Sequence, residues 1–257
     1  MLYIFVEFLK TKSFNMKYIF LCVFVFFSSS VFSQIVFIEN TKESDEKGWS
    51  GAIELEYDYN KSTEIDMEFI NSSFLQWNNE TWTIFLLNEI DLNRAGDKDF
   101  ANNSLQHFRL SYHVKDNYAI ESFLQNQHDL VHNIENRGLA GVGVRTKLPV
   151  LDIIGVSAFF EYEELVDSSS NEDIRLSVYN QLSFNISEKV KFSNSVYYQP
   201  KTEDFSDYRL ALEASISVPL SKKLFLTNSF SLAHDTHPAN DIPNTTYQIK
   251  NSLKYEF

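Results

Sequence analysis

The chain has 257 residues, 22% of them charged and 15% aromatic, and a formal net charge of −13. This acidic balance argues against nucleic-acid binding, which depends largely on cationic contacts with phosphate. A mean hydropathy of −0.25 excludes a polytopic helical membrane protein, and only seven glycines and five prolines exclude a collagen-like or low-complexity chain.

The N-terminal segment predicts export. A short basic start at Lys17 precedes an apolar run from Ile19 to Phe27, and Val31 and Ser33 occupy the two positions where a signal peptidase needs modest side chains. This run is shorter than a membrane-spanning helix requires. We therefore predict that residues 1–33 are an upstream extension and a signal peptide.

Removal of that segment changes the chemistry available to the mature chain. The only cysteine, Cys22, lies within it, so the mature chain would offer neither a disulfide nor a thiolate metal site. The sequence leaves open whether Met1 or Met16 is the true start. Residues 34–48 follow as a polar periplasmic lead-in.

From residue 49 onward, apolar and polar residues alternate, which is typical of strands because neighbouring side chains point to opposite faces. In the last segment, apolar residues recur at every second position from Tyr247 to Phe257, interrupted only by Asn251. The predicted strands are 49–60, 62–77, 81–94, 99–114, 118–131, 137–149, 152–164, 173–186, 189–199, 207–220, 223–235 and 244–257.

The lengths of these segments favour a membrane barrel. Most exceed the roughly 5–6 residues of a soluble strand and reach the roughly 9–11 residues that cross a bilayer at a tilt. Short connections largely alternate with longer ones, as they do between periplasmic turns and outer loops. The prediction is an all-β fold, a closed antiparallel up-and-down transmembrane β-barrel of about 12 strands over residues 49–257. A soluble lipocalin-like barrel or a sandwich is the alternative.

Aromatic residues near the predicted strand ends fit the girdles of an outer-membrane barrel. These residues are Trp49, Trp77, Trp82, Tyr112, Tyr118, Tyr198, Tyr247 and Tyr255. The amphipathic final strand, with Tyr255 and Phe257 on its apolar face, is also the kind of signal that barrel assembly machinery reads. We therefore expect this machinery, outer-membrane lipid and lipopolysaccharide to be the partners.

Several short motifs resemble domain-of-unknown-function family 481, whose members are sometimes labelled salt-induced outer-membrane proteins. The motifs are Arg137–Arg145, Phe159–Glu163, Tyr197–Pro200, Asp207–Arg209 and the ending Tyr255–Phe257. Their order and spacing extend the likeness over roughly residues 49–257. The resemblance implies an outer-membrane barrel and no known substrate or reaction.

Alternation also places many charged residues on the inner face. The candidate lumen residues are Arg109, Arg145, Arg175, Arg209, Glu121, Glu161, Glu163 and Glu213. Arginine matches carboxylate geometry well, so one interpretation is a lumen cross-linked by salt bridges. The other is a narrow polar channel with a charged constriction. Inward Phe85 and Phe123 favour filling, whereas Gly141 and Gly143 make room for rings or for a solute.

The function that we expect is a narrow passive channel or small porin of unknown substrate. The alternative is a structural or envelope-integrity barrel with a filled lumen and no transport, and a barrel enzyme is a weaker third hypothesis. The dipeptides His128-Asp129 and His234-Asp235 lack the further groups that barrel hydrolases use, so we predict no catalytic residues.

Metal binding has equally thin support in the sequence. His234 and His237 near Asp235 and Asp241 fall short of a full ligand set, so we predict neither a metal site nor a cofactor. Acidic residues of the predicted outer loops, such as Asp167, are candidates for divalent ions that bridge lipopolysaccharide.

Overall fold

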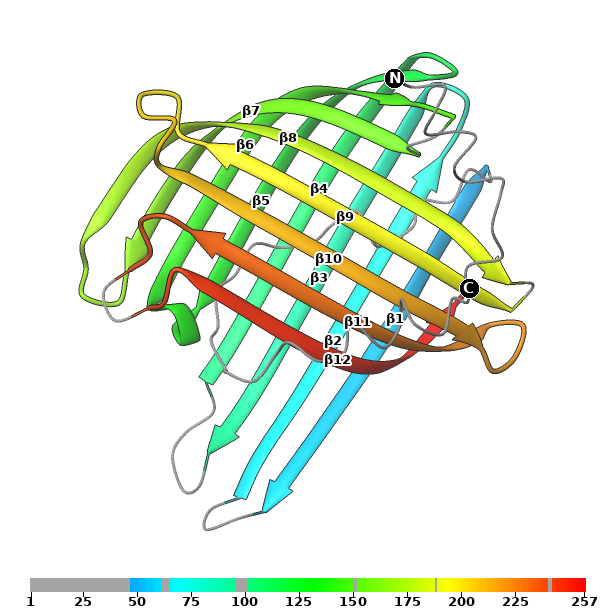
Figure 1. The fold of residues 1–257 in the computed structure, drawn as a ribbon. Helices are drawn as coiled ribbons and strands as arrows, with labels where there is room; N and C mark the ends of the chain where they lie inside the picture. Colours follow the sequence, from blue (N-terminus) through cyan, green and yellow to red (C-terminus); the bar gives the residue numbers. More distant parts are fainter. Residues whose placement is uncertain (1–46, 62–64, 96–100, 150–151, 188, 240–241) are drawn as a thin grey trace, which may run out of the picture. The chain divides into compact units, whose positions relative to one another are not determined.

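The computed structural model describes residues 47–61, 65–95, 101–149, 152–187, 189–239 and 242–257. They form twelve antiparallel strands that close into one barrel, in which each strand pairs with its neighbours in the chain and β1 meets β12 (Figure 1). This architecture confirms the predicted fold class. The predicted signal peptide and most of the lead-in lie outside the described residues. No helix among the described residues is long and apolar enough to cross a membrane.

The strand bounds follow the alternation of the sequence closely. The strands are β1 (Gly48–Lys61), β2 (Ile65–Asn78), β3 (Trp82–Ala95), β4 (Ala101–Lys115), β5 (Tyr118–Asp129), β6 (Ile134–Lys147), β7 (Ile153–Leu165), β8 (Ser170–Ser187), β9 (Val190–Pro200), β10 (Tyr208–Pro219), β11 (Leu224–Asp235) and β12 (Thr245–Glu256).

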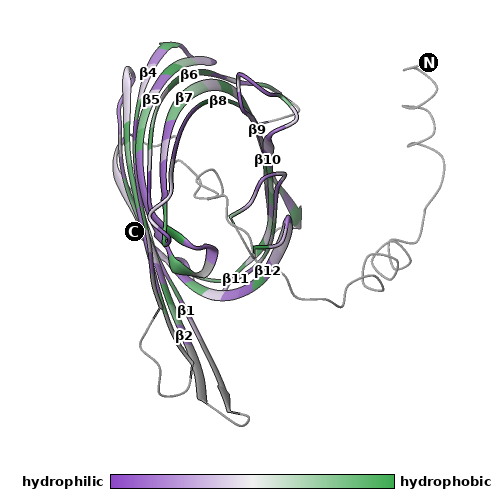
Figure 2. Cartoon of the chain, turned by 90° about the vertical axis from the view of Figure 1, so that its left-hand side faces the viewer, coloured by the Kyte–Doolittle hydropathy of each residue, from purple (hydrophilic) through white to green (hydrophobic). Residues whose placement is uncertain are grey.

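Two faces result from this alternation. On β7, Phe159 and Glu161 are buried, whereas Val156 and Phe160 between and beside them are exposed. The buried face is the inner one, because side chains on it form hydrogen bonds between strands that are not neighbours in the wall. For example, the Tyr179 hydroxyl on β8 donates to Glu121 on β5 at 2.6 Å. Figure 2 shows the strands as a ring around this interior. The barrel therefore has apolar residues on its outer face and polar residues on its inner face, which is the arrangement that lipid requires.

The three tryptophans lie together at one end of the barrel. Trp49, Trp77 and Trp82 stand at the ends of β1, β2 and β3 beside the short turn between β2 and β3, and Trp49 is directly opposite Trp77. The Trp82 ring lies 4.8 Å from the ring of Tyr112. The side chains of these residues alternate with the buried ones, so they point outward. They form the aromatic girdle expected at a membrane interface.

The seam between β1 and β12 is the shortest ladder of the wall. Only Ala52–Leu55 pair in register with Leu253–Glu256, and Gly51 and Phe257 then exchange two backbone hydrogen bonds. Every other ladder has at least the nine register pairs of β8 with β9. Beyond Leu55, β1 continues with β2 to Lys61 and diverges from β12, as Figures 1 and 2 show.

Several predicted boundaries differ from the structure by up to three residues, among them the start of β8, which lies at Ser170 rather than 173. Two of these differences have a clear physical reason. β6 begins at Ile134 rather than 137, because the register of its pairing with β7 shifts between Ile134 and Asn136 and the alternation changes phase there. The preceding segment, predicted as strand to 131, instead ends at Asp129, whose side chain caps a 3-10 turn over Leu130–His132.

Candidate functional site: the barrel lumen

A cluster of buried charges lies on the inner wall toward the long connections. Its centre is Glu161 on β7, which is 2% exposed. Its carboxylate accepts hydrogen bonds from Arg137 on β6 at 2.5 Å, from Arg175 on β8 at 2.8 Å and from Arg209 on β10. Glu163, on the same strand, is 3.1 Å from the Arg209 guanidinium. One carboxylate thus joins three strands across the interior; we call this set the Glu161 cluster.

Further acids complete this cluster at the barrel rim. Asp235 on β11 is 2.7 Å from Arg209, and Asp207 is 3.0 Å from Arg175. Lys201, just after β9, pairs with Asp173 on β8. Hydrogen bonding to the Asp173 carboxylate raises the pKa of Lys201. The cationic groups of this cluster are therefore matched by carboxylates.

A second cluster lies nearer the short turns, around Glu121 on β5. The Glu121 carboxylate is 3.2 Å from Arg145 and 3.6 Å from Arg109, and it accepts the Tyr179 hydroxyl. Tyr179 stacks on Tyr197 with 5.4 Å between ring centroids. This wall is therefore an assembly of guanidiniums, carboxylates and rings in mutual contact.

Aromatic side chains fill the space between the two clusters. His107, Phe123 and Phe159 form a row with centroid distances of 5.7 and 6.2 Å, and a cavity of about 50 Å³ lies beside them. A side chain at Gly141 would come within 2.3 Å of the Phe123 ring, so this glycine makes room for the ring. The lumen is therefore filled along the wall of β4–β10.

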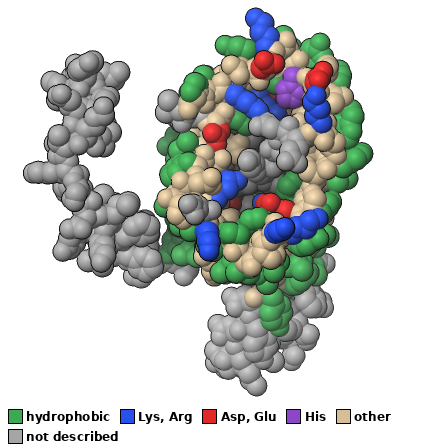
Figure 3. Space-filling model, turned by 90° about the vertical axis from the view of Figure 1, so that its right-hand side faces the viewer, with side chains coloured by type: hydrophobic (Ala, Val, Ile, Leu, Met, Phe, Trp, Pro, Cys, Tyr) green, Lys and Arg blue, Asp and Glu red, His purple; other side chains and the backbone are tan. Residues whose placement is uncertain are grey.

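The facing wall is different. Lys250 on β12 interacts electrostatically with the carboxylates of Glu56, Glu89, Asp91 and Glu213, which come from β1, β3 and β10. All these side chains are partly exposed, in contrast to the buried arginines opposite. In this part of the described lumen, the ammonium group of Lys250 interacts with four carboxylates; we call these five residues the acidic wall. Charged side chains also surround the hollow at the short-turn end of the barrel (Figure 3).

The structure places all eight sequence-predicted lumen residues on the inner face and brings most of them together. Arg175, Arg209, Glu161 and Glu163 share one cluster, and Arg109, Arg145 and Glu121 share the other. Glu213 belongs to neither and lies in the acidic wall. Sequence reasoning missed Arg137, although strict alternation back from Arg145 points it inward.

Neither histidine–aspartate dipeptide forms an internal pair, because adjacent strand residues point to opposite faces. His234 contacts Thr245 at 2.8 Å, whereas Asp235 binds Arg209. His128 contacts the backbone oxygen of Glu135.

Acidic residues of the long connections are used in local turns. Asp167 and Asp204 each accept hydrogen bonds from the hydroxyl and the amide of the serine two residues later. These bonds lower the pKa of both carboxyls. No group of three potential metal ligands occurs within the residues that the structure describes, and Asp241 lies outside them.

Comparison with known proteins identifies the family. Residues 43–257 match the family described as a protein of unknown function, DUF481. The chain belongs to the DUF481 family. No curated protein matches it.

Solved structures that resemble this DUF481 chain are outer-membrane β-barrels. The COG4313 outer membrane channel from Pseudomonas putida F1 has 8% sequence identity and a TM-score of 0.50, over 86% of this chain and 99% of that one. The translocator domain of the autotransporter NalP from Neisseria meningitidis has 9% identity and a TM-score of 0.47, over 85% and 91% of the two chains. At such identities the likeness shows a shared fold.

Proposed function

We propose that this protein resides in a bacterial outer membrane and forms a narrow passive channel that favours small cations and has no catalytic activity. One observation carries the proposal: the arginines of the Glu161 cluster are matched by carboxylates and the two arginines at Glu121 share one, whereas the acidic wall opposite has four carboxylates and one cation. A solute in the lumen would therefore meet net negative charge. Export by the predicted signal peptide and the transmembrane fold support the location.

Ion selectivity tests this proposal. We expect refolded protein in planar bilayers to give small conductance steps, with a zero-current potential in a salt gradient that indicates cation preference. The double variant Glu89→Gln/Glu213→Gln should reduce the cation-to-anion permeability ratio by at least roughly fivefold, because each of the two unit charges that it removes contributes about 1 kcal/mol at about 4 Å in water. Glu203→Gln, in an exposed connection, is the matched control and should leave the ratio unchanged. Anion preference in the parent protein would contradict the proposal.

A second function has its own support. The filled wall of β4–β10 and its buried charge clusters are what a structural or envelope-integrity barrel would need. If the barrel is folded in the bilayer but gives no conductance step, the result would favour this structural role over the channel. Deletion of the gene would then change detergent or osmotic sensitivity without changing solute uptake.

A further inference from the structure

Four polar residues interrupt the lipid-facing surface in one continuous row. Ser73 on β2, Asn88 on β3, Gln106 on β4 and Asn126 on β5 stand directly opposite one another in register across the four strands. Their side chains alternate with buried ones and therefore point outward. We call this set the amide row.

The amide row lies within the apolar band on β3 and borders it on β4 and β5, where the next outward residues toward the long connections are Ser104 and His128. On the outward face of β3, Asn88 is flanked by Leu86 and Ile90, which are 46% and 39% exposed. On β4 and β5, the next outward residues toward the short turns are Phe108 and Leu124, 40% and 59% exposed. The primary amide of Asn88, between two apolar neighbours, is costly in lipid unless its two donors and its acceptor find partners.

The hydrogen bonds within the amide row use only some of the donors and acceptors of its side chains. Gln106 donates to the Asn88 side chain at 3.4 Å, and Ser73 donates to the Asn88 backbone oxygen at 3.5 Å, both near the upper limit for a hydrogen bond. Other outward amides differ, since Asn194 donates to a backbone oxygen at 2.9 Å. The amide row thus retains donors and acceptors that a neighbour could use.

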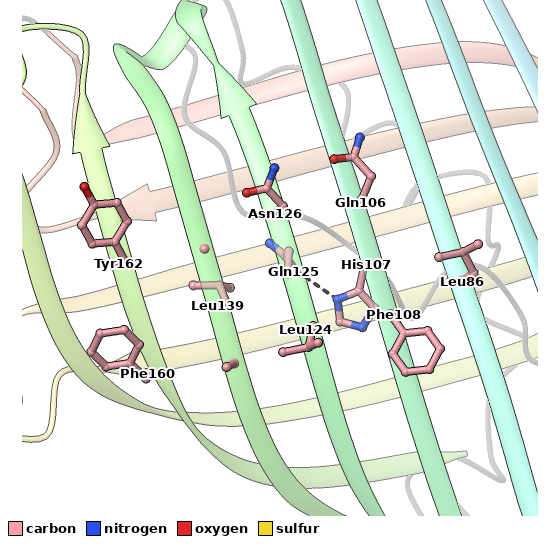
Figure 4. A pocket seen from close by; sticks show the side chains of 12 residues that line it. Leu86, Gln106, His107, Phe108, Leu124, Gln125, Asn126, Leu139, Phe160 and Tyr162 are labelled. Carbon is pink, nitrogen blue, oxygen red and sulfur yellow. Dashed lines mark hydrogen bonds between the residues drawn. The ribbon is translucent and has the colours of Figure 1, made fainter.

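An apolar groove adjoins the amide row. Two overlapping hollows of about 410 and 540 Å³ share Phe108, Leu124, Ala140 and Phe160. In Figure 4, the Phe108 and Phe160 rings lie on either side of Leu124, with Gln106 and Asn126 at one end of the groove. The Phe108 ring, which we call the ridge, occupies one outward face together with the groove and the amide row, and this face is built from β2 to β7.

We propose that this face packs against the same face of a second copy of this chain in the membrane. The surface complements itself: the Phe108 ridge of one copy fits the groove between Phe108 and Phe160 of the other, and a row of amides is both donor and acceptor. A two-fold interface requires such self-complementarity. Small residues with polar hydrogen-bonding groups are the features that associate proteins within lipid. An acyl chain would fill the groove but satisfy no amide. The inference does not depend on channel activity.

Cross-linking from single cysteines tests this interface. In a Cys22→Ser background, which has no other cysteine, Leu124→Cys places a thiol in the groove. Phe230→Cys on β11 is the matched probe on the other side of the barrel, also on an outward strand position six residues from the short-turn end. We expect a short bis-maleimide, applied to vesicles at a low protein-to-lipid ratio, to give a dimer band at Leu124→Cys and little at Phe230→Cys.

The amide row is then tested in the same membranes. With Leu124→Cys as the probe, Asn88→Leu/Gln106→Leu should lower the dimer association constant by roughly tenfold, because polar contacts within lipid contribute on the scale of such a change. Asn194→Leu should leave it unchanged. Heat-modifiable migration in gels verifies folding of each variant.

Equal cross-linking at both cysteines, or dimers that persist without the amides, would overturn the proposal. The proposal would also be overturned if the folded protein is a monomer that retains bound lipid, or if the mass of the cross-linked product is not twice that of the chain.

Discussion

Replacement of Glu161 by glutamine should destabilise the barrel by about 3–5 kcal/mol, the range for removing one partner from a buried ion pair. This carboxylate is 2% exposed and is bonded to Arg137, Arg175 and Arg209. An amide of the same shape accepts fewer charge-assisted hydrogen bonds and cannot neutralise the three guanidiniums. The measurement is the urea midpoint for unfolding from lipid vesicles, followed by tryptophan fluorescence.

A control for this substitution lies on the same strand. Glu164 points outward near the end of β7, where its carboxylate accepts the Tyr162 hydroxyl at 3.3 Å. Glu164→Gln should change the unfolding free energy by no more than about 0.5 kcal/mol, as is usual for surface positions. Equal midpoints for the two variants would show that the Glu161 cluster does not stabilise the barrel.

Removal of Phe257 should abolish efficient closure of the barrel. Its backbone donates to Gly51 at 3.0 Å and accepts from Gly51 at 3.2 Å, which extends a seam of only four register pairs. Unpaired backbone groups cost several kcal/mol each in lipid, so the loss is large relative to the seam. We expect the yield of heat-modifiable protein to fall sharply when the truncated chain is refolded into vesicles.

Phe257→Ala separates closure from recognition by assembly machinery. It keeps both backbone bonds and removes the ring that covers Gly51. We expect near-normal refolding in vitro but a strong loss of assembled protein in cells, where the aromatic end would be read. Normal refolding of the truncated chain would contradict the importance of the seam. Normal assembly of Phe257→Ala in cells would contradict the predicted signal.

The alternation of side chains made the fold predictable, and its limits are visible at particular residues. The period of two fails at Ile134, where the bulge in β6 shifts the phase, and at Ser170, where β8 extends through polar residues. Beyond the lipid both faces of a strand meet water, so no apolar face remains to mark it. Strand ends outside the membrane are therefore the least predictable part.

The sequence could predict that the side chains of the lumen residues point inward, but it could not predict which residues pair with one another. Alternation places Arg209 and Glu161 on the inner face, yet they lie on β10 and β7 and meet across the interior. Which carboxylate faces which arginine depends on the stagger between strands, which no short motif encodes. The contrast between the matched cluster and the acidic wall likewise required coordinates, because Lys250 gathers acids from β1, β3 and β10.

Depth-dependent quenching of tryptophan fluorescence is the most direct test that this chain spans a membrane. Its only three tryptophans, Trp49, Trp77 and Trp82, all lie in the girdle at the short-turn end. In vesicles of brominated lipids, we expect strong quenching by bromine near the headgroups and weaker quenching by bromine near the chain ends. A mature protein that stays folded and monomeric in plain buffer, with fluorescence that neither lipid quenches, would contradict the transmembrane barrel.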